Sequence, residues 1–530
     1  MSAKKPTAPA TRPIRRVLIA NRGEIAVRIA RACRELGVES IAVYSEADAG
    51  APHVRAADRS VLIGPAPASQ SYLRGDHLIE VAKQLDADAI HPGYGFLSER
   101  EWFARAVREA GLIWIGPPAE AIAAMGSKTA ARTLAIAAGT PVVPGTTEAL
   151  RDATQAAELA AQFGYPVLLK AAAGGGGKGM RVVRAPAEIA GALESAKREA
   201  QNAFGDDAVY IEKYIEGPRH VEIQILADAH GTCVAVGERE CSIQRRHQKM
   251  IEEAPSVAVS PELRKRMGDA AVAAAKAAGY VNAGTCEFLL DAHGDFYFLE
   301  ANTRIQVEHP VTELVTGLDL VQWQLRIAAG EQLPFTQAPE PRGWAIECRI
   351  TSEDPAHGFL PSTGRITALH LPSGPGIRWD GGIEVGTTVG LSYDPMLAKL
   401  IVHAPTREAA IARMRRALQE LVIEGVETSC EFHLRMMDDP DYQRSAVDIQ
   451  WLEAKLPALL GAPAPEETLR AAAVGAVLLA ERDRQGRARQ VGNGSANGAA
   501  RSAAVDAQGG ASIEVRGWAR LAREESLRRR

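Results

Sequence analysis

Apolar runs alternate with helical segments over the first 120 residues. VLIA at 17–20 is long enough for a buried parallel strand, IAVRIARACREL at 25–36 has apolar residues at helical spacing, and SIAVYS at 40–45 is a second strand. Similar strand and helix patterns continue through 78–95 and 103–117. Residues 13–120 therefore predict a doubly wound α/β domain.

Two further units follow, and their patterns differ from the first. Strand pairs predominate up to about residue 335, whereas the next 120 residues mix strands such as 396–404 with a helix over 407–423. We expect α/β and α+β architecture, divided into a disordered basic tail at 1–13, an N-terminal domain at 14–126, a central domain at 127–335 with a flap subdomain at about 143–215, a mixed α+β domain at 336–455, and a low-complexity tail at 456–530. Arginines around Trp518 make the tail a possible partner-binding segment.

Composition narrows the possible functions of the 530-residue chain. The 61 Lys and Arg against 65 Asp and Glu give a formal charge of −4, which with 5% aromatic residues argues against nucleic-acid binding. The six cysteines form no C-x-x-C pair, and no apolar run reaches the roughly 20 residues that span a bilayer. We expect a cytoplasmic protein with no membrane partner. The basic start lacks the apolar core of a secretory signal and predicts a disordered tail, an organelle transit sequence being the alternative.

Four consecutive glycines stand between two strand-like runs. Gly174, Gly175, Gly176 and Gly177 follow Lys170 and precede MRVV at 180–183. Because the second flank is strand-like, the pattern predicts a hairpin flap and not the strand-to-helix turn of a P-loop. Glycines let backbone N–H groups approach phosphate oxygens closely, and Lys170 adds positive charge. We interpret the loop as a phosphate-binding flap, with a mobile surface hairpin as the alternative.

Two strand-like runs around residues 292–295 predict a pair of facing carboxylates. If these four residues form the turn, the cross-strand pairs are Asp291 with Phe296, Leu290 with Tyr297, and Glu287 with Glu300. Directly opposed like charges destabilise a sheet, since their Cβ atoms lie only about 4.5–5.5 Å apart. A Mg²⁺ ion held by the carboxylates and by nucleotide phosphates would remove that repulsion.

Beyond this pair the polar residues keep to even positions. Asn302, Arg304, Gln306 and Glu308 alternate with smaller or apolar residues. In an extended chain the even side chains project to one face, which would add an amide, a guanidinium, a second amide and a third acid to the carboxylate pair. A half-exposed strand with solvated charges is the alternative, but it does not explain the opposed acids.

A basic cluster follows the strand-like run at 235–240. Its members are Arg245, Arg246, His247 and Lys249. Alone the cluster would be read as a basic surface turn. Next to a phosphate flap and a carboxylate pair, we interpret it as a candidate anion-binding segment.

These features together are those of an ATP-grasp ligase, and more narrowly the chain resembles biotin carboxylase, the ATP-dependent component of biotin-dependent acyl-CoA carboxylases. The resemblance covers about residues 14–455. The strings that carry it include IANRGEIAVRI, AIHPGYGFLSE, KAAAGGGGKGMR, ERECSIQRRHQKMIEEAP, EANTRIQVEHPVTE and YDPMLAKL. It implies a central ATP-grasp domain with a glycine-rich flap between the N-terminal α/β domain and the C-terminal α+β domain.

The resemblance also implies a role for each matched residue. The ATP-binding residues would be Lys128, Lys170, Gly174, Gly175, Gly176, Gly177, Glu212, Lys213, Ile215, His220, Gln244 and His247. The ligands of Mg²⁺ or Mn²⁺ would be Glu287, Glu300 and Asn302, and the bicarbonate site would comprise Lys249, Arg304, Gln306 and the Val307 amide. The biotin pocket would comprise Tyr94, Gly95, Arg349 and Asp394. The catalytic set would be Glu308 as general base and Arg349 as the residue that stabilises the biotin enolate, with Lys249 and Arg304.

The implied reaction is the ATP- and bicarbonate-dependent carboxylation of biotin through carboxyphosphate. It is the first half-reaction of an acyl-CoA carboxylase acting on acetyl-CoA, propionyl-CoA or a similar acceptor. The sequence has no Met-Lys-Met biotinylation motif, so we expect biotin on a separate carrier protein and the carboxyltransferase on another chain. A homodimer or a larger complex is implied, although Pro375 stands where the family's dimer contact is aromatic. The alternatives are another ATP-grasp carboxylate–amine ligase and a non-catalytic nucleotide-binding subunit.

Overall fold

The computed structural model describes residues 11–146, 148–171, 180–204 and 206–461, together with 470, 473–475 and 477–478. The chain divides into two units, Met1–Leu456 and Pro457–Arg530. The four predicted flap glycines, the basic start at 1–10 and the low-complexity part of the tail lie outside the described residues.

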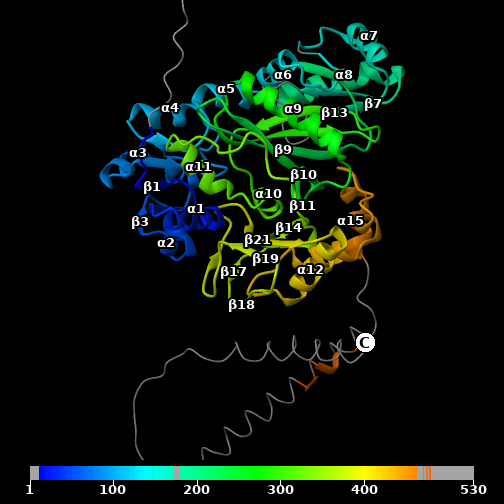
Figure 1. The fold of residues 1–530 in the computed structure, drawn as a ribbon. Helices are drawn as coiled ribbons and strands as arrows, with labels where there is room; N and C mark the ends of the chain where they lie inside the picture. Colours follow the sequence, from blue (N-terminus) through cyan, green and yellow to red (C-terminus); the bar gives the residue numbers. More distant parts are fainter. Residues whose placement is uncertain are drawn as a thin grey trace, which may run out of the picture. The chain divides into compact units, whose positions relative to one another are not determined.

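A five-stranded parallel sheet with the order β3-β2-β1-β4-β5 forms the first part of the fold, drawn in blue in Figure 1. Its strands are β1 (Arg16–Ile19), β2 (Glu39–Tyr44), β3 (Arg59–Leu62), β4 (Ala89–His91) and β5 (Ile113–Trp114). Its helices are α1 (Gly23–Glu35), α2 (Pro52–Ala56), α3 (Gly75–Gln84), α4 (Glu101–Glu109) and α5 (Ala119–Gly126). Alternate residues of β1 belong to two separate hydrophobic cores, Val17 to one and Leu18 to the other. Both faces of the sheet are therefore covered, which confirms the doubly wound prediction.

An eight-stranded sheet with the order β13-β12-β9-β10-β11-β14-β21-β19 forms the centre of the fold. Its strands are β9 (Arg219–Ala227), β10 (Cys233–Arg245), β11 (Gln248–Ala254), β12 (Asn282–Leu290), β13 (Phe296–Asn302), β14 (Trp344–Thr351), β19 (Ile377–Gly381) and β21 (Met396–Ala404). Helices α9 (Pro261–Ala277), α10 (His309–Thr316) and α11 (Leu320–Ala328) belong to the same stretch of chain. All the pairings between neighbouring strands are antiparallel. The sheet thus joins residues of the predicted central and C-terminal domains.

The β12–β13 register confirms one predicted pair and corrects two. Glu287 is paired with Glu300, as predicted, but Leu290 is paired with Phe296 and not with Tyr297. The turn is one residue longer than predicted, because the Asp291 backbone N–H donates to the Asp295 carbonyl at 2.9 Å. A register shift between Glu287 and Phe288 compensates for the longer turn.

A separate three-stranded sheet with the order β7-β6-β8 carries the flap strands. Its strands are β6 (Val167–Ala171), β7 (Met180–Val183) and β8 (Val209–Lys213), and helices α7 (Ala153–Phe163) and α8 (Ile189–Phe204) pack against it. Helix α6 (Lys128–Ala137) packs instead against β13 and α9. β6 and β7 pair antiparallel on either side of the glycines, as predicted for a hairpin. Apolar residues of α7, α8 and this sheet form their own core.

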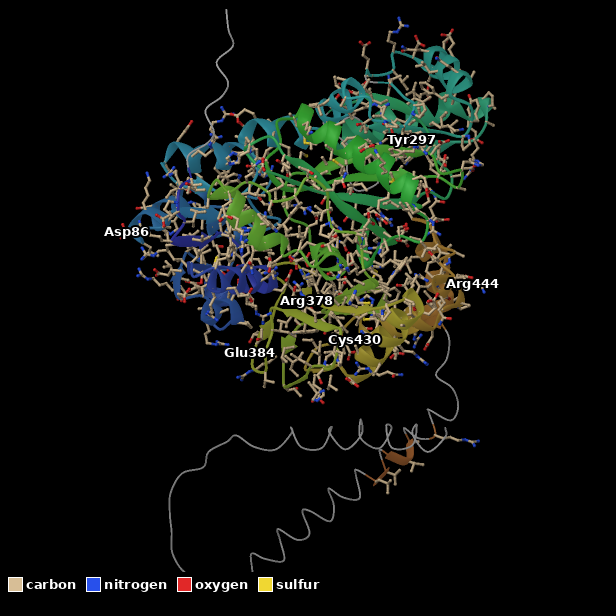
Figure 2. The ribbon with its side chains drawn as sticks, viewed as in Figure 1. Asp86, Tyr297, Arg378, Glu384, Cys430 and Arg444 are labelled. Atoms are coloured by element: carbon tan, nitrogen blue, oxygen red, sulfur yellow. The ribbon has the colours of Figure 1, made fainter. Side chains whose placement is uncertain are left out.

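The remaining elements follow β14 in the chain. They are β15 (Glu353–Asp354), β16 (Leu360–Pro361), β17 (Gly364–Arg365), β18 (Ala368–His370), β20 (Thr388–Val389), α12 (Arg407–Glu420), β22 (Val422–Glu424), α13 (Cys430–Asp438), α14 (Pro440–Gln443) and α15 (Trp451–Gly461). The predicted helix over 407–423 ends at Glu420, because the following residues enter β22 and pair with β18. Arg378 and Glu384, labelled in Figure 2, contact earlier segments: Arg378 binds Glu313 of α10, and Glu384 forms an ion pair with Arg55 of α2.

Candidate active site

A cavity of about 970 Å³ lies where the flap strands face the large sheet. The predicted site residues among its lining are Lys170, Glu212, Lys213, Ile215, His220, Gln244, His247, Lys249, Glu287, Glu300, Asn302, Arg304, Gln306, Val307, Glu308, Arg349 and Asp394. Tyr94 and Gly95 are not among the lining residues. Lys128 begins α6, and its side chain lies outside the described part of the structure.

The Lys249 ammonium is the centre of the polar contacts in the cavity. Its Nζ lies 2.5 Å from Glu222 Oε2, 2.9 Å from Glu287 Oε1 and 2.7 Å from Glu308 Oε1. Burial alone would lower the pKa of Lys249, but the three carboxylates outweigh burial and raise it well above its usual range. Lys249 therefore remains a cation and draws the three acids together.

Glu308 is 2% exposed and is held between two cations. One oxygen accepts from Lys249, and the other lies 3.0 Å from the Arg349 guanidinium. Burial acts to raise the pKa of Glu308, but the charges of Lys249, Arg349 and Arg239 lower it overall. Glu308 is consequently ionised near neutral pH. It can accept a proton only after its interactions with these cations weaken.

Glu287 and Glu300 meet the requirements of a site for a hard divalent cation. They are direct cross-strand partners, and Asn302, on β13 with Glu300, adds an amide. Carboxylate and amide oxygens are the ligands that Mg²⁺ and Mn²⁺ prefer. Glu287 Oε1 accepts from Asn302 Nδ2 and from Gln306 Nε2, both at 2.8 Å, and its Oε2 lies 3.1 Å from His220 Nε2. Burial acts to raise the pKa of Glu287, but Lys249 and His220 outweigh it and lower the pKa well below its usual range, so the group is an anion.

A second group of possible metal ligands, His220, Glu222 and Glu287, lies close together. Glu222 already binds two cations, Lys249 and the fully buried Arg239. A third positive charge at Glu222 would be repelled by them, so the Glu287–Glu300 pair is the better metal site.

The predicted nucleotide residues lie on the flap strands and on β9 to β11. Lys170 Nζ donates to Glu212 Oε2 at 2.8 Å, so a phosphate would have to compete with this carboxylate. The Lys213 ammonium donates to the carbonyls of Gly164 and Tyr165 at 2.9 and 3.0 Å and is thereby fixed by the main chain.

Two further members of the predicted nucleotide set, His220 and Gln244, contact each other. Gln244 Nε2 lies 2.9 Å from His220 Nδ1. His247 has a backbone φ of 64° in the turn between β10 and β11, an uncommon value for a residue other than glycine or asparagine. The turn places Lys249 at the start of β11, inside the cavity.

The predicted bicarbonate residues line the same cavity, and each of them has other partners in this structure. Arg304 donates to Glu99 Oε2 at 3.1 Å and to Asn302 Oδ1 at 3.0 Å. The Val307 carbonyl accepts a hydrogen bond from Lys399 Nζ at 2.9 Å. Residues 303–308 do not continue β13, so the even positions do not form the predicted extended face. Gln306 and Glu308 reach the site through a turn that leads into α10.

The predicted biotin residues come from three separate segments. The Arg349 guanidinium on β14 lies 2.6 Å from Glu252 Oε1 as well as near Glu308. Asp394 Oδ1 accepts from the Met396 backbone N–H at 2.8 Å, which fixes its side chain. The Tyr94 hydroxyl donates to the buried Glu24, and the neighbouring Gly95 has a positive φ of 69°.

Sequence reasoning missed the buried charges that support these residues. Glu222, Arg239, Glu252 and Glu347 are all 0% exposed. Arg239 donates to Glu222, Gln224, Thr312, Thr285 and Gln306. Its bond to Gln306 orients the side-chain amide that donates to Glu287. The available signal was a charged residue directly between apolar residues of a strand, as Glu222 is between Val221 and Ile223 in β9.

The cavity is lined by a lysine on the first strand of the glycine-bearing hairpin and by an acidic hairpin. This combination defines an ATP-grasp enzyme, and the comparisons with known proteins agree with that class. Residues 13–122 match the family described as "Biotin carboxylase, N-terminal domain", 127–336 match "Carbamoyl-phosphate synthase L chain, ATP binding domain", and 347–454 match "Biotin carboxylase C-terminal domain". The chain is 51% identical over 442 residues to biotin carboxylase 1 of Bacillus subtilis, covering 83% of this chain and 98% of that protein. It is 54% identical over 430 residues to the biotin carboxylase of Halalkalibacterium halodurans, covering 81% and 95%.

Solved structures give the same result. The biotin carboxylase of Campylobacter jejuni, solved as a β,γ-ATP complex, matches with a TM-score of 0.78 at 47% identity, covering 83% of this chain and 99% of that one. The biotin carboxylase domain dimer of Hydrogenobacter thermophilus 2-oxoglutarate carboxylase, solved with MgADP, ADP and bicarbonate, matches with a TM-score of 0.78 at 46% identity, covering 85% and 99%. The chain belongs to the biotin carboxylase family of ATP-dependent enzymes. Within its described residues, no helix has both the length and the apolar character needed to cross a membrane.

Proposed function

We propose that this chain uses ATP and bicarbonate to carboxylate biotin carried on a separate protein. The observation that carries the proposal is the position of Lys249, whose ammonium contacts Glu287 of the metal pair and Glu308, the proposed base, within one cavity. An anion bound at Lys249 would lie between the metal site and the base. Family membership supports this reaction over that of a carboxylate–amine ligase, and the intact acids argue against a non-catalytic role.

Bicarbonate binding at Lys249 would change the basicity of Glu308. Bicarbonate is a weak nucleophile until it loses its proton, and a bound anion competes with Glu308 for the positive charge of Lys249. As the lysine turns toward the anion, the pKa of Glu308 rises and the carboxylate becomes a better base. Arg304, which holds Glu99 and Asn302 here, and Gln306 would complete the bicarbonate site together with the Val307 amide.

The nucleotide would bind between the flap strands and the large sheet. Lys170 and Lys128 would hold its phosphates, the loop of Gly174 to Gly177 would cover them, and the adenosine would contact Glu212, Lys213 and Ile215 with His220, Gln244 and His247 nearby. Glu287, Glu300 and Asn302 would hold Mg²⁺ or Mn²⁺, which neutralises charge on the phosphates during phosphoryl transfer to bicarbonate. Carboxyphosphate is the expected product of that transfer. Water must be excluded because it would hydrolyse this intermediate.

Biotin would bind near Arg349, where the carboxyphosphate decomposes to CO₂ and phosphate. The released phosphate can take the ureido proton, and the Arg349 guanidinium would stabilise the enolate that results. Asp394 would contact the ureido group from the loop before β21, with Tyr94 and Gly95 completing the pocket after a local movement. Glu308 and Glu252 keep Arg349 in place until biotin arrives.

Support for the proposed partners comes from the relatives of this chain. The relatives include subunits of pyruvate and methylcrotonoyl-CoA carboxylases. We propose a separate biotin carrier protein and a carboxyltransferase as partners, in a homodimer or a larger complex. The three domain boundaries and a cytoplasmic location stay predictions.

The test is an ATPase assay on the purified chain. ATP cleavage should require bicarbonate and a divalent cation and should rise when free biotin is added. Lys249→Met should abolish the bicarbonate-dependent part, whereas Lys265→Met, which removes an exposed lysine paired with Asp269, should not. ATP cleavage that ignores bicarbonate, or that responds to an amine instead, would reject the proposal.

A further inference from the structure

Charged residues occupy adjacent positions across four strands beside the proposed active site. Glu252 of β11 is paired with Glu347 of β14, Arg349 of β14 with Lys399 of β21, and Lys399 with Asp380 of β19. Cross-strand partners, and residues two apart on a strand, project from the same face of a sheet. All five side chains therefore lie on one face, and four of them are at most 4% exposed.

The hydrogen bonds of the two cations in this row go to groups other than Glu347 and Glu252 Oε2. Lys399 Nζ donates to the Val307 carbonyl and lies 3.1 Å from Glu24. Arg349 binds Glu252 Oε1 and Glu308 Oε2. Within the described part of the chain, both oxygens of Glu347 and the second oxygen of Glu252 have no hydrogen-bond partner.

An ionised carboxylate without a partner is costly in a site closed to water. The titratable and charged groups around the two glutamates are Arg349, Lys399, Lys249, Glu308, Tyr94, Cys241 and Cys348, and Glu24 lies beyond them beside Lys399 and Tyr94. Burial raises the pKa of Glu252 to about 7 despite the charge of Arg349. Burial likewise raises the pKa of Glu347 well above its usual range, although Lys399 opposes it. One proton on the pair would remove the charge of one carboxylate and supply a donor to the other.

We propose that Glu252 and Glu347 share one proton and act together as a positioning pair for Arg349. Glu347 carries the proton and donates it in a hydrogen bond to Glu252 Oε2. Glu252 remains an anion, and its Oε1 stays fixed against the guanidinium. The inference rests on the proposed function only in the part assigned to Arg349, since the proton itself is a property of the folded chain.

The shared proton gives the biotin step a dependence on pH. When Glu347 ionises, its negative charge faces Glu252 without a counter-ion, and Arg349 is drawn from Glu308 toward the doubly charged pair. A guanidinium so displaced no longer faces the enolate. We therefore expect the biotin-dependent rate to fall at alkaline pH, while bicarbonate-dependent ATP cleavage without biotin changes less.

The first experiment compares Glu347→Gln, which keeps a donor without a titratable proton, with Glu347→Met, which has no donor. At neutral pH, Glu347→Met should lower the biotin-dependent rate at least about tenfold, mainly through the biotin KM, and Glu347→Gln should lose about threefold or less. Between about pH 6 and 9, Glu347→Gln should also lose the alkaline fall of the wild type. Glu238→Gln, which alters a buried glutamate bound to Arg264 away from the cavity, should keep the wild-type pH profile.

Equal losses in Glu347→Gln and Glu347→Met, or an alkaline fall that persists in Glu347→Gln, would overturn the proposal. A second measurement needs neither activity nor a stable Met variant. The infrared spectrum of the wild-type protein in D₂O at neutral pD should contain the C=O band of a protonated carboxyl group, and Glu347→Gln should remove it. Absence of this band from the wild type would also overturn the proposal. A wild-type chain with the band but without bicarbonate-dependent ATP cleavage would instead reject the proposed function alone.

Discussion

Lys249 Nζ lies 2.7 Å from Glu308 Oε1, although the two residues belong to different elements, β11 and the turn before α10. This contact connects the metal pair to the proposed base, because the same ammonium also binds Glu287. It keeps Glu308 ionised and poorly basic until another anion shares the lysine. In the proposed mechanism, the base is therefore activated by the substrate whose proton it removes.

Replacing Glu308 with glutamine tests the role of this carboxylate. Glu308→Gln should lower bicarbonate-dependent turnover by a factor of about 10²–10⁴, the usual contribution of a general base. The ATP dissociation constant should stay near that of the wild type, because Glu308 faces Lys249 and Arg349 and not the flap. Nucleotide titration and steady-state ATPase assays give the two values. A loss of ATP affinity comparable to the loss of turnover would assign Glu308 to nucleotide binding.

The opposed acids are tested by metal titration. Glu287→Gln and Glu300→Gln should each raise the Mg²⁺ concentration needed for half-maximal ATPase activity. The double variant should lose less than the product of the single effects, because both carboxylates serve one ion. Unchanged apparent metal affinity in both single variants would show that the pair binds no metal. Asp291→Asn, at the turn of the same hairpin, serves as a control outside the cavity.

Arg239 is predicted to be a major determinant of stability. Arg239→Met leaves the fully buried Glu222 without one of its cations, and breaking a buried ion pair from one side typically costs about 3–5 kcal/mol. Urea unfolding should show a drop in the free energy of unfolding of that order. Arg105→Met, which breaks an exposed pair with Glu101, should cost less than about 1 kcal/mol. Similar effects in the two variants would contradict this expectation.

His53 should make the fold sensitive to acid. It is fully buried, its Nε2 lies 3.3 Å from the Val43 carbonyl, and burial lowers its pKa to about 4. Because the folded pKa lies below the usual value, the contribution of His53 is present above about pH 6.5 and is lost as the pH falls toward 4. At pH 5 the loss amounts to about 2 kcal/mol. His53→Gln should reduce the difference in unfolding free energy between pH 7 and pH 5, and an unchanged difference would count against this role.

The β12–β13 hairpin shows how far the sequence could predict the site. The pairing of Glu287 with Glu300 was predicted correctly, although the turn was assigned one residue too few. Asp291 Oδ1 accepts from the backbone N–H groups of His293 and Asp295, both at 2.9 Å, and so closes a longer turn. Leu299 is then passed over in the register, and this shift restores the pair. Such compensation depends on local hydrogen bonds that alternation of residues does not reveal.

Long-range burial accounts for what the sequence did not predict. Glu252 and Glu347 are almost 100 residues apart and become neighbours only because β11 and β14 pair. Glu252 is followed directly by Glu253 on β11, and Glu347 stands two residues before Arg349 on β14. Nothing local shows whether either glutamate faces water or another acid. The strings that resemble the family identified the residues that we propose to contact ligands, but they did not identify the buried groups that set the charges of those residues.

The eight-stranded sheet also has a mechanical consequence. Backbone hydrogen bonds connect β13, which carries Glu300, to β14, which carries Arg349, through strands β12, β9, β10 and β11 without a break. The distance between the Glu287–Glu300 pair and Arg349 is therefore fixed by the backbone of one continuous sheet. In the described part of the chain, no strand of the three-stranded sheet that carries Lys170 pairs with a strand of the eight-stranded sheet. We therefore expect conformational changes during turnover to occur mainly in the smaller sheet, which carries the proposed nucleotide-binding Lys170. The spacing of Glu300 and Arg349 on the large sheet should stay constant.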